Sequence, residues 1–431
     1  MNSQLLLSLR ILMFFSASAI AFSQNDWTTQ NSTTTSWLTC VKTVNQEIAW
    51  AGGDSGIVIR TTNGGNSWIR VGKGTLGTSE RLNTIDAIDS TTAFVVTPFY
   101  SSSETSIYRT SDGGNTWTKV FSQTGGYIHN LHMLTSIKGI AYGEPVGGKW
   151  TILQTLNGGI SWDRIGTEPI PDSLEYGSSY NSLNVLDTNT YMFLSNTKVY
   201  RTTDAGITWT THNTPLTFLD MWINSNGAGV ATTNVAGKVA QTTDNGETWT
   251  IGTIQTIGDQ VGGAGTKDFW IVGDYTGQGY GLFRSTDGGF SWNLEYTSYG
   301  QYLYALDFIT LENNTVGFVT GVFGAISRYS GTITSINSET LNRPLRFDLS
   351  QNYPNPFNPT TTISFTLPSQ SLVSLKVFDM LGREVSTVVV GELQAGSYTR
   401  QWNAATFVSG VYFYRLQAGT YSETKKLLLL K

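Results

Sequence analysis

The stretch Arg284-Ser-Thr-Asp-Gly-Gly-Phe-Ser-Trp292 occurs, with small changes, six times in this chain of 431 residues. Each copy follows two short apolar runs separated by a glycine-containing turn, which is typical of β-strands. A spacing of 40 to 49 residues predicts four short strands per repeat, the content of one blade of a β-propeller. The copies end on tryptophans 49, 45, 47, 40 and 43 residues apart: Trp68, Trp117, Trp162, Trp209, Trp249 and Trp292.

The repeated stretch resembles the Asp-box, or bacterial neuraminidase (BNR), repeat, whose pattern is Ser/Thr-x-Asp-x-Gly-x-x-Trp. In such a turn a short acidic or amide side chain accepts hydrogen bonds from backbone amides, and glycine takes a positive φ. Asparagine can replace the aspartate because its amide oxygen accepts the same bonds. We expect these residues, like the six tryptophans, to be structural: Asn63, Asp112, Asn157, Asp204, Asp244 and Asp287.

A seventh repeat is reduced to residues 325–331, and no tryptophan follows it. Its Arg328 lies 44 residues after Arg284. We predict that the segment around Trp27 supplies the missing outer strand, because pairing the first strand with the last blade closes the ring and removes both sheet edges. The predicted fold class is therefore all-β, with a single seven-bladed β-propeller over residues 24–331 followed by a smaller domain.

That smaller domain follows a polar linker predicted at residues 332–344. Residues 345–431 open on a proline-rich stretch, Asn352-Tyr-Pro-Asn-Pro-Phe-Asn-Pro359, and continue as short alternating strands, which predict a small Ig-like β-sandwich. Val377–Val385, Ser409–Leu416 and Lys425–Lys431 follow in an order that resembles the type A sorting domain of type IX secretion, the Por secretion tail. The resemblance implies that the type IX machinery is a partner of this domain.

The first 23 residues predict a secretory signal peptide, since Arg10 precedes the apolar run 11–21 and Ala21-Phe-Ser23 ends it. No segment is long enough to predict a membrane span, so we expect a protein that crosses the periplasm and is secreted or attached to the outer-membrane surface. Removal of Arg10 changes the formal net charge from −5 to −6. An acidic protein is not expected to bind nucleic acid, because binding to phosphates needs a basic surface.

Metal and cofactor sites are not predicted. Cys40 is the only cysteine, which leaves no intramolecular disulfide and no cysteine-based zinc site. His129 and His132 are three residues apart on a predicted strand, so we expect their side chains to point to opposite faces and not to share a metal.

Candidate ligand-binding residues lie on the loops between the second and third strands of a blade and between blades, opposite the Asp-box turns. They are Asp54, Tyr100, Lys149, Asp274, Tyr275 and Tyr299. The repeats also resemble the photosystem II assembly and stability factor family, which supports the fold more than a role.

The sequence gives less support to an enzymatic function. A sialidase needs three arginines for its substrate carboxylate, and Arg81 is the only propeller arginine expected free on a loop. Resemblance to Asp-box xyloglucanases implies paired carboxylates, for which the candidates are Asp172 and Glu175, with Glu144 nearby. We therefore predict a secreted or cell-surface propeller that binds a glycan or a protein. The alternative is an extracellular glycoside hydrolase acting on polysaccharide.

Overall fold

The computed structural model describes residues 26–431 except positions 73, 75, 78–80, 98–103, 174, 179–181, 276–278, 299–301, 312–313, 333–346, 368–370, 394–395 and 420. The predicted signal peptide and nearly all of the predicted linker lie outside the described residues, as do Tyr100 and Tyr299. The chain is all-β, with two single-turn 3₁₀ segments, η1 (Asp54–Gly56) and η2 (Val322–Gly324), among the described residues.

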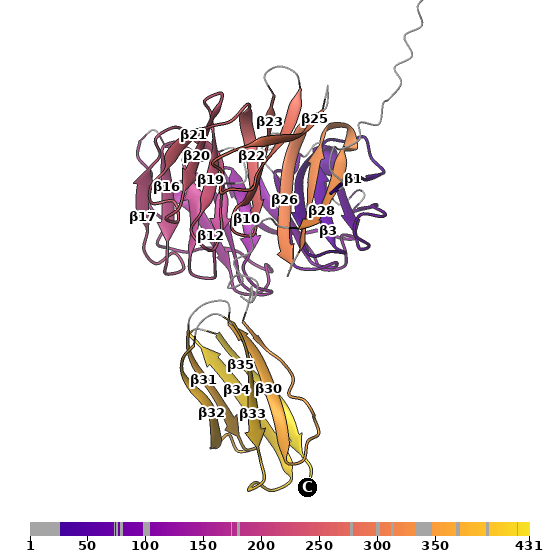
Figure 1. Ribbon diagram of the computed structural model, residues 1–431, viewed down its shortest axis with the longest axis vertical. Coiled ribbons are helices and arrows are strands. Elements are labelled where there is room, and N and C mark those ends of the chain that lie inside the picture. Colours follow the sequence, from indigo (N-terminus) through magenta and orange to yellow (C-terminus); the bar gives the residue numbers. More distant parts are fainter. Residues whose placement is uncertain are drawn as a thin grey trace, which may run out of the picture.

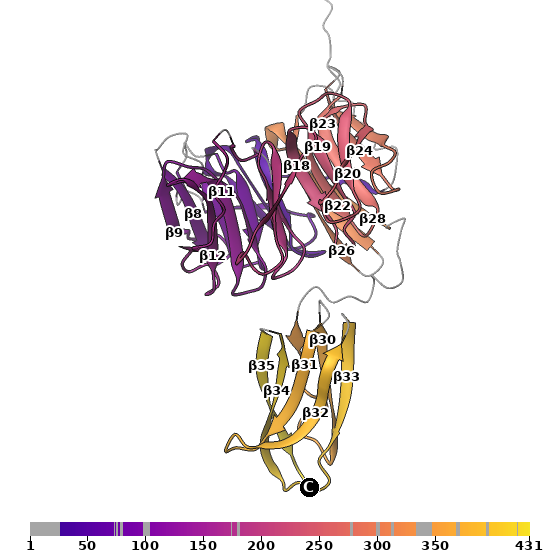
Figure 2. The same ribbon diagram turned by 90° about the vertical axis from the view of Figure 1, so that its left-hand side faces the viewer.

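Residues 27–332 form seven antiparallel four-stranded sheets in the described part (Figures 1 and 2). The first strand of each sheet contributes residues to the lining of one central cavity. This arrangement is a β-propeller. Six sheets use consecutive strands: β2 to β5 (Leu38–Thr43, Ala49–Gly53, Val58–Thr61, Ile69–Val71), β6 to β9 (Thr84–Ala87, Ala93–Thr97, Glu104–Thr110, Thr118–Thr124), β10 to β13 (Ile128–Met133, Gly139–Val146, Lys149–Thr155, Asp163–Arg164), β14 to β17 (Leu183–Val185, Tyr191–Leu194, Lys198–Thr202, Thr210–Asn213), β18 to β21 (Phe218–Ile223, Gly229–Thr233, Lys238–Thr242, Thr250–Thr253) and β22 to β25 (Ile257–Ala264, Asp268–Asp274, Tyr280–Ser285, Asn293–Ser298).

The remaining propeller sheet joins the two ends of the repeat region. Its strands are β26 (Leu303–Leu311), β27 (Asn314–Gly321), β28 (Ile326–Thr332) and, outermost, β1 (Trp27–Thr29). Trp27 pairs with Tyr329, and its indole packs against the rings of Phe308 and Tyr329. The predicted pairing of the first strand with the last repeat is therefore confirmed.

The turns between the third and fourth strands share one hydrogen-bond pattern. In the second sheet, the Gly114 amide donates to Thr110 Oγ at 2.9 Å, and the Thr116 hydroxyl donates to Asp112 at 2.6 Å. The hydroxyl and amide of Thr116 lower the pKa of Asp112 to about 2. In the first sheet Asn63 takes the same place and accepts from the Ser67 amide at 2.9 Å.

The C-terminal residues form two packed sheets, drawn in gold and yellow in Figure 1. One sheet contains β29 (Asp348–Leu349), β30 (Thr360–Leu367) and β33 (Gly396–Asn403), and the other contains β32 (Glu384–Leu393), β31 (Ser371–Phe378), β34 (Gly410–Ala418) and β35 (Tyr421–Leu429). A single core that includes Phe365, Leu375, Trp402 and Tyr414 joins them, so this unit is a β-sandwich. No helix in the described part of the chain is long and apolar enough to cross a membrane.

Candidate functional site

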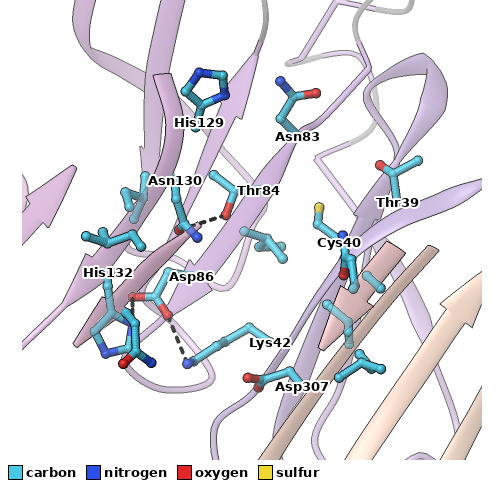
Figure 3. Close-up of a pocket in the computed structure, with 18 of the residues that line it drawn as sticks. Thr39, Cys40, Lys42, Asn83, Thr84, Asp86, His129, Asn130, His132 and Asp307 are labelled. Carbon is cyan, nitrogen blue, oxygen red and sulfur yellow. Dashed lines mark hydrogen bonds and ion pairs between the residues drawn. The ribbon is translucent and has the colours of Figure 1, made fainter. Parts of the chain in front are cut away.

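The innermost strands of the propeller enclose a channel with a cavity of about 760 Å³. The innermost strands of four neighbouring sheets each place an acidic or basic side chain at the same register position, opposite the matching residue of the second strand. These side chains are Asp307, Lys42, Asp86 and His132, labelled in Figure 3. One side of the channel is therefore lined by an arc in which acidic and basic side chains alternate.

This arc holds neighbouring strands together. The Met133 amide donates to Asp86 Oδ2, and the Thr43 amide donates to Asp307 Oδ2, each at 2.6 Å and each across to the next sheet. Lys42 Nζ lies 3.5 Å from Asp86 Oδ1. Burial raises the pKa of Asp307, and the positive charge of Lys42 opposes that rise only in part. Since both carboxylates accept hydrogen bonds from backbone amides of the next sheet, their first role is to hold neighbouring innermost strands together.

The loop end of the channel is shaped by β-bulges. Near the start of five innermost strands in the described part the register shifts by one residue. A bulge redirects the side chain of the residue that it leaves unpaired. The residues left unpaired are Thr39, His129, Leu219, Asp259 and Tyr304.

The bulge in β10 corrects one prediction. His129 and His132 do not point to opposite faces, because the extra residue breaks the alternation and both side chains line the channel. They lie at different levels (Figure 3) and contact different acids. His129 Nε2 is 3.0 Å from Glu144 Oε1, whereas His132 Nδ1 is 3.8 Å from Asp86 Oδ2.

Two aromatic rings and an ion pair meet at the mouth, between the last sheet and the first two. The rings of Trp37 and Tyr304 lie 5.8 Å apart between centroids with an interplanar angle of 35°. The guanidinium of Arg81 lies 5.4 Å from the centroid of Tyr304. Its Nε is 3.4 Å from Asp54 Oδ1, in a pair whose side chains are 40% and 35% exposed. The predicted ligand residue Asp54 is thus part of this cluster.

The last two propeller sheets carry three further aromatic residues near this end of the channel. Tyr302 precedes β26, is 53% exposed, and packs edge-on against Tyr280 at 4.7 Å. Phe323 in η2 is 61% exposed and has φ 55°. A bulky residue in the left-handed region is strained by about 1–3 kcal/mol. We call Trp37, Tyr280, Tyr302, Tyr304 and Phe323 the aromatic strip.

Of the three carboxylates considered for catalysis, Glu144 in β11 lines the channel, whereas Asp172 and Glu175 lie in the segment between β13 and β14 and are not among the lining residues. Glu144 Oε1 accepts from the Gly177 amide at 3.1 Å, in addition to its contact with His129. Asp172 Oδ2 is 2.5 Å from Lys198 Nζ. The side chain of Glu175 is 3% exposed and accepts from the hydroxyls of Ser195 and Tyr200 at 2.8 and 2.5 Å.

These contacts define what the carboxylates can do. Burial raises the pKa of Glu175, but the hydrogen bonds from Tyr200, the Asp172 amide and Ser195, with the charge of Lys198, outweigh it and lower the pKa overall. A general acid needs the reverse, a raised pKa. The ionised carboxylate of Glu175 therefore holds the loop that carries it against β16.

The other predicted ligand residues are spread over the loop face. Lys149 is exposed at the tip of the β11–β12 hairpin. Asp274 ends β23, and the Tyr275 ring packs inward, 5.7 Å from Phe283. Sequence reasoning missed Trp37, Tyr302, Tyr304 and Phe323. A usable signal was present, because Trp37-Leu38 and Tyr302-Leu303 repeat an aromatic residue directly before an innermost strand.

Fold and site together define an all-β protein in which a propeller, open at its loop end, is followed by a β-sandwich. Residues 351–430 match the family model of the secretion system C-terminal sorting domain. Residues 21–142 match the model of the photosynthesis system II assembly factor YCF48. The chain therefore combines a YCF48-like propeller with a C-terminal sorting domain, and that domain marks it for export to the cell surface or beyond.

Solved structures agree on the propeller. YCF48 bound to a D1 peptide has 19% identity and a TM-score of 0.57, and the match covers 72% of this chain and 98% of that one. YCF48 from Cyanidioschyzon merolae has 19% identity and a TM-score of 0.54, with coverage of 70% and 98%. At this identity the likeness shows the fold. No curated protein matches the chain in sequence.

Proposed function

We propose that this protein is a secreted or surface-attached binding propeller whose ligand docks at the loop end of the central channel. The observation that carries the proposal is the aromatic strip, which includes Tyr304 in the channel lining and the exposed Tyr302 and Phe323. Exposed aromatic rings supply large contact area at a low cost in side-chain entropy, and they are enriched among residues that dominate binding. The strained backbone at Phe323 supports a functional role, because strain of this kind clusters at ligand sites.

The YCF48 structure supports the choice of a binding role. That propeller was solved with a bound D1 peptide. In this chain the loops at that end of the channel differ from sheet to sheet, and loops on a rigid scaffold commonly hold ligands.

Hydrolysis is less well supported by the geometry. A glycoside hydrolase requires two carboxylates that face the substrate, one of them protonated. Hydrogen bonds lower the pKa of the Glu175 carboxyl group, and Asp172 is ion-paired with Lys198. If the full chain released reducing sugar from a polysaccharide panel, and Glu144→Gln abolished the release, the binding assignment would give way to an enzyme.

Arrays test the proposal directly. The purified full chain is applied to glycan and peptide arrays beside the double variant Arg81→Ala/Tyr302→Ala. We expect at least one ligand class to bind the parent chain and to lose most of its signal with the double variant. Phe290→Ala is the matched control, because its ring is 66% exposed but lies on an Asp-box turn at the opposite end. Ligands that bind all three proteins equally would place the site elsewhere.

A further inference from the structure

We propose that the ligand of the channel mouth is an uncharged glycan, with one sugar ring seated on Trp37 and Tyr304 and its hydroxyl groups held by Arg81 and Asp54. This inference rests on the proposed function and names the chemistry of its ligand.

The two rings form a platform of the right size for a sugar. Their centroids are 5.8 Å apart and their planes differ by 35°, so the two rings pack against each other as one aromatic unit. Trp37 keeps 37% of its surface exposed. A pyranose has an apolar face of C–H groups that covers such a platform, and burying it removes apolar surface from water.

The polar half of the cluster matches the rim of the same sugar. Arg81 offers N–H donors, and Asp54 offers carboxylate acceptors, 3.4 Å from Arg81 Nε. Neighbouring hydroxyl groups both donate and accept, so they can bond to an arginine and an aspartate side by side. Hydrogen bonds that involve a charged partner are the stronger ones.

The charges at the mouth favour a neutral ligand. Arg81 is balanced by Asp54, and His129 lies against Glu144. An acidic sugar or an acidic peptide would require positive charge in excess of these pairs. Neither pair provides an unbalanced cation.

The backbone at the mouth disfavours an extended peptide. A peptide that adds to a sheet needs a regular strand edge with free amides and carbonyls. Bulges interrupt five innermost strands at this level in the described part. The recognition surface is therefore made of side chains.

The platform is also fixed before a ligand arrives. The Asp54 amide donates to the Trp37 carbonyl at 2.9 Å, which ties the aromatic and the acidic residue to one another through the backbone. The Val322 amide donates to the Tyr302 carbonyl at 2.9 Å in the equivalent place of the last sheet. A preorganised site loses less entropy on binding.

Affinity electrophoresis of the full chain tests the inference. Native gels contain one soluble polysaccharide each: xyloglucan, galactomannan or a β-1,3-glucan as neutral probes, and polygalacturonate or alginate as acidic ones. We expect retardation by at least one neutral polymer and by neither acidic one. Calorimetry with oligosaccharides of the retained polymer should show an affinity nearly unchanged between about 50 and 500 mM sodium chloride, since no net charge is paired.

Variants locate the site. Trp37→Ala should weaken binding about tenfold or more, as expected for an aromatic anchor. Asp54→Asn and Arg81→Lys keep the side-chain volume and should weaken it severalfold, while Phe290→Ala should bind as the parent does. Near-ultraviolet circular dichroism of each variant controls for folding.

Three results would overturn the inference: no retardation by any neutral polymer, retardation only by the acidic ones, or equal binding by the parent chain and Trp37→Ala. Peptides that bind in a manner dependent on Arg81 and Tyr302, with no glycan binding, would overturn this ligand class and leave the proposed function standing. Loss of both kinds of binding would remove the proposed function as well.

Discussion

Aspartate and asparagine occupy the same position of the repeated turn, and the structure explains why both work. Asn63 accepts from the Ser67 amide as Asp112 accepts from the Thr116 amide. They differ at the neighbouring hydroxyl. The Thr116 hydroxyl donates to Asp112, whereas the Asn63 amide group donates to Ser67 Oγ. The turn is thus closed by the oxygen acceptor, and the charge matters only to its pH dependence.

Exchanging the two residue types should change acid sensitivity more than stability at neutral pH. The pKa of Asp112 falls from 3.8 to about 2 in the folded chain. Its ionised form therefore stabilises the fold fully above about pH 4, and this contribution is lost as the pH falls from about 4 to about 2. Urea unfolding midpoints at pH 7 and pH 3 should show a smaller acid loss for Asp112→Asn than for the parent.

Two companions make that comparison sharp. Asn63→Asp introduces a titrating group into the sister turn and should enlarge the acid loss. Asp112→Ala removes the acceptor and should lower the midpoint at both pH values. An identical acid loss for Asp112→Asn and the parent would show that this turn does not titrate with folding.

At the scale of elements, an arginine on the third strand of a sheet contacts the next sheet. Arg109 Nε donates to the Gly158 carbonyl at 2.8 Å, and Arg201 pairs with Glu247 at 3.2 Å, so each contacts the following Asp-box turn. Arg284 has no such turn after it. It is buried instead against Asp268 and Glu295, at 2.9 and 3.4 Å.

This exception closes the ring. Glu295 also accepts from the indole nitrogen of Trp27 at 2.9 Å, so the buried cluster of the sixth sheet is tied to β1 of the last sheet. Arg284 stacks over Trp270 at 4.9 Å from its centroid. The N-terminal strand thus takes the place of the missing seventh turn.

Trp27→Ala should destabilise the protein by about 3–5 kcal/mol, the usual cost of truncating a buried tryptophan. The ring is 6% exposed, and its loss also leaves Glu295 without the indole donor. Urea unfolding measures the change, and hydrogen exchange of residues 326–332 should accelerate. Thr29→Ala, an exposed site on the same strand, should change little. Equal midpoints for both variants would mean that β1 does not hold the ring.

The elements could be predicted from the sequence better than the site. Gly-rich turns and the tryptophan period fix where strands begin and end, because they act locally. Trp37 and Tyr304 escaped notice because their exposure depends on bulges and on contacts between residues more than 260 positions apart. Asp172 and Glu175 were predicted as a catalytic pair because they are close in sequence. In the folded chain, however, the Glu175 carboxylate is hydrogen-bonded to Ser195 and Tyr200 and ion-paired with Lys198.

At the scale of the whole molecule, the propeller and the C-terminal sandwich have separate cores and separate roles. The propeller presents the aromatic strip, and the sandwich over residues 351–430 is a secretion sorting domain. The domain boundaries at residues 23, 331 and 344 remain predictions.

Deletion of residues 345–431 should leave the propeller in the periplasm, since it removes the sorting domain. Cell fractionation and immunoblotting follow the truncated chain beside the parent. As the complementary control, residues 333–431 joined to a periplasmic reporter should carry the reporter to the surface or the medium. Normal export of the truncated chain would show that the signal lies in the propeller.

The last propeller sheet has a mechanical consequence. Its strand β28 is the last propeller strand before the C-terminal sandwich in the chain, and its strand β26 carries Tyr304 of the mouth. When the tail is held and a ligand pulls on the mouth, tension has only to cross from β28 through β27 to β26. Seven residue pairs join β28 to β27 and eight join β27 to β26, whereas three join β28 to β1. The load path therefore runs through the best-paired part of that sheet and spares the short strand that closes the ring.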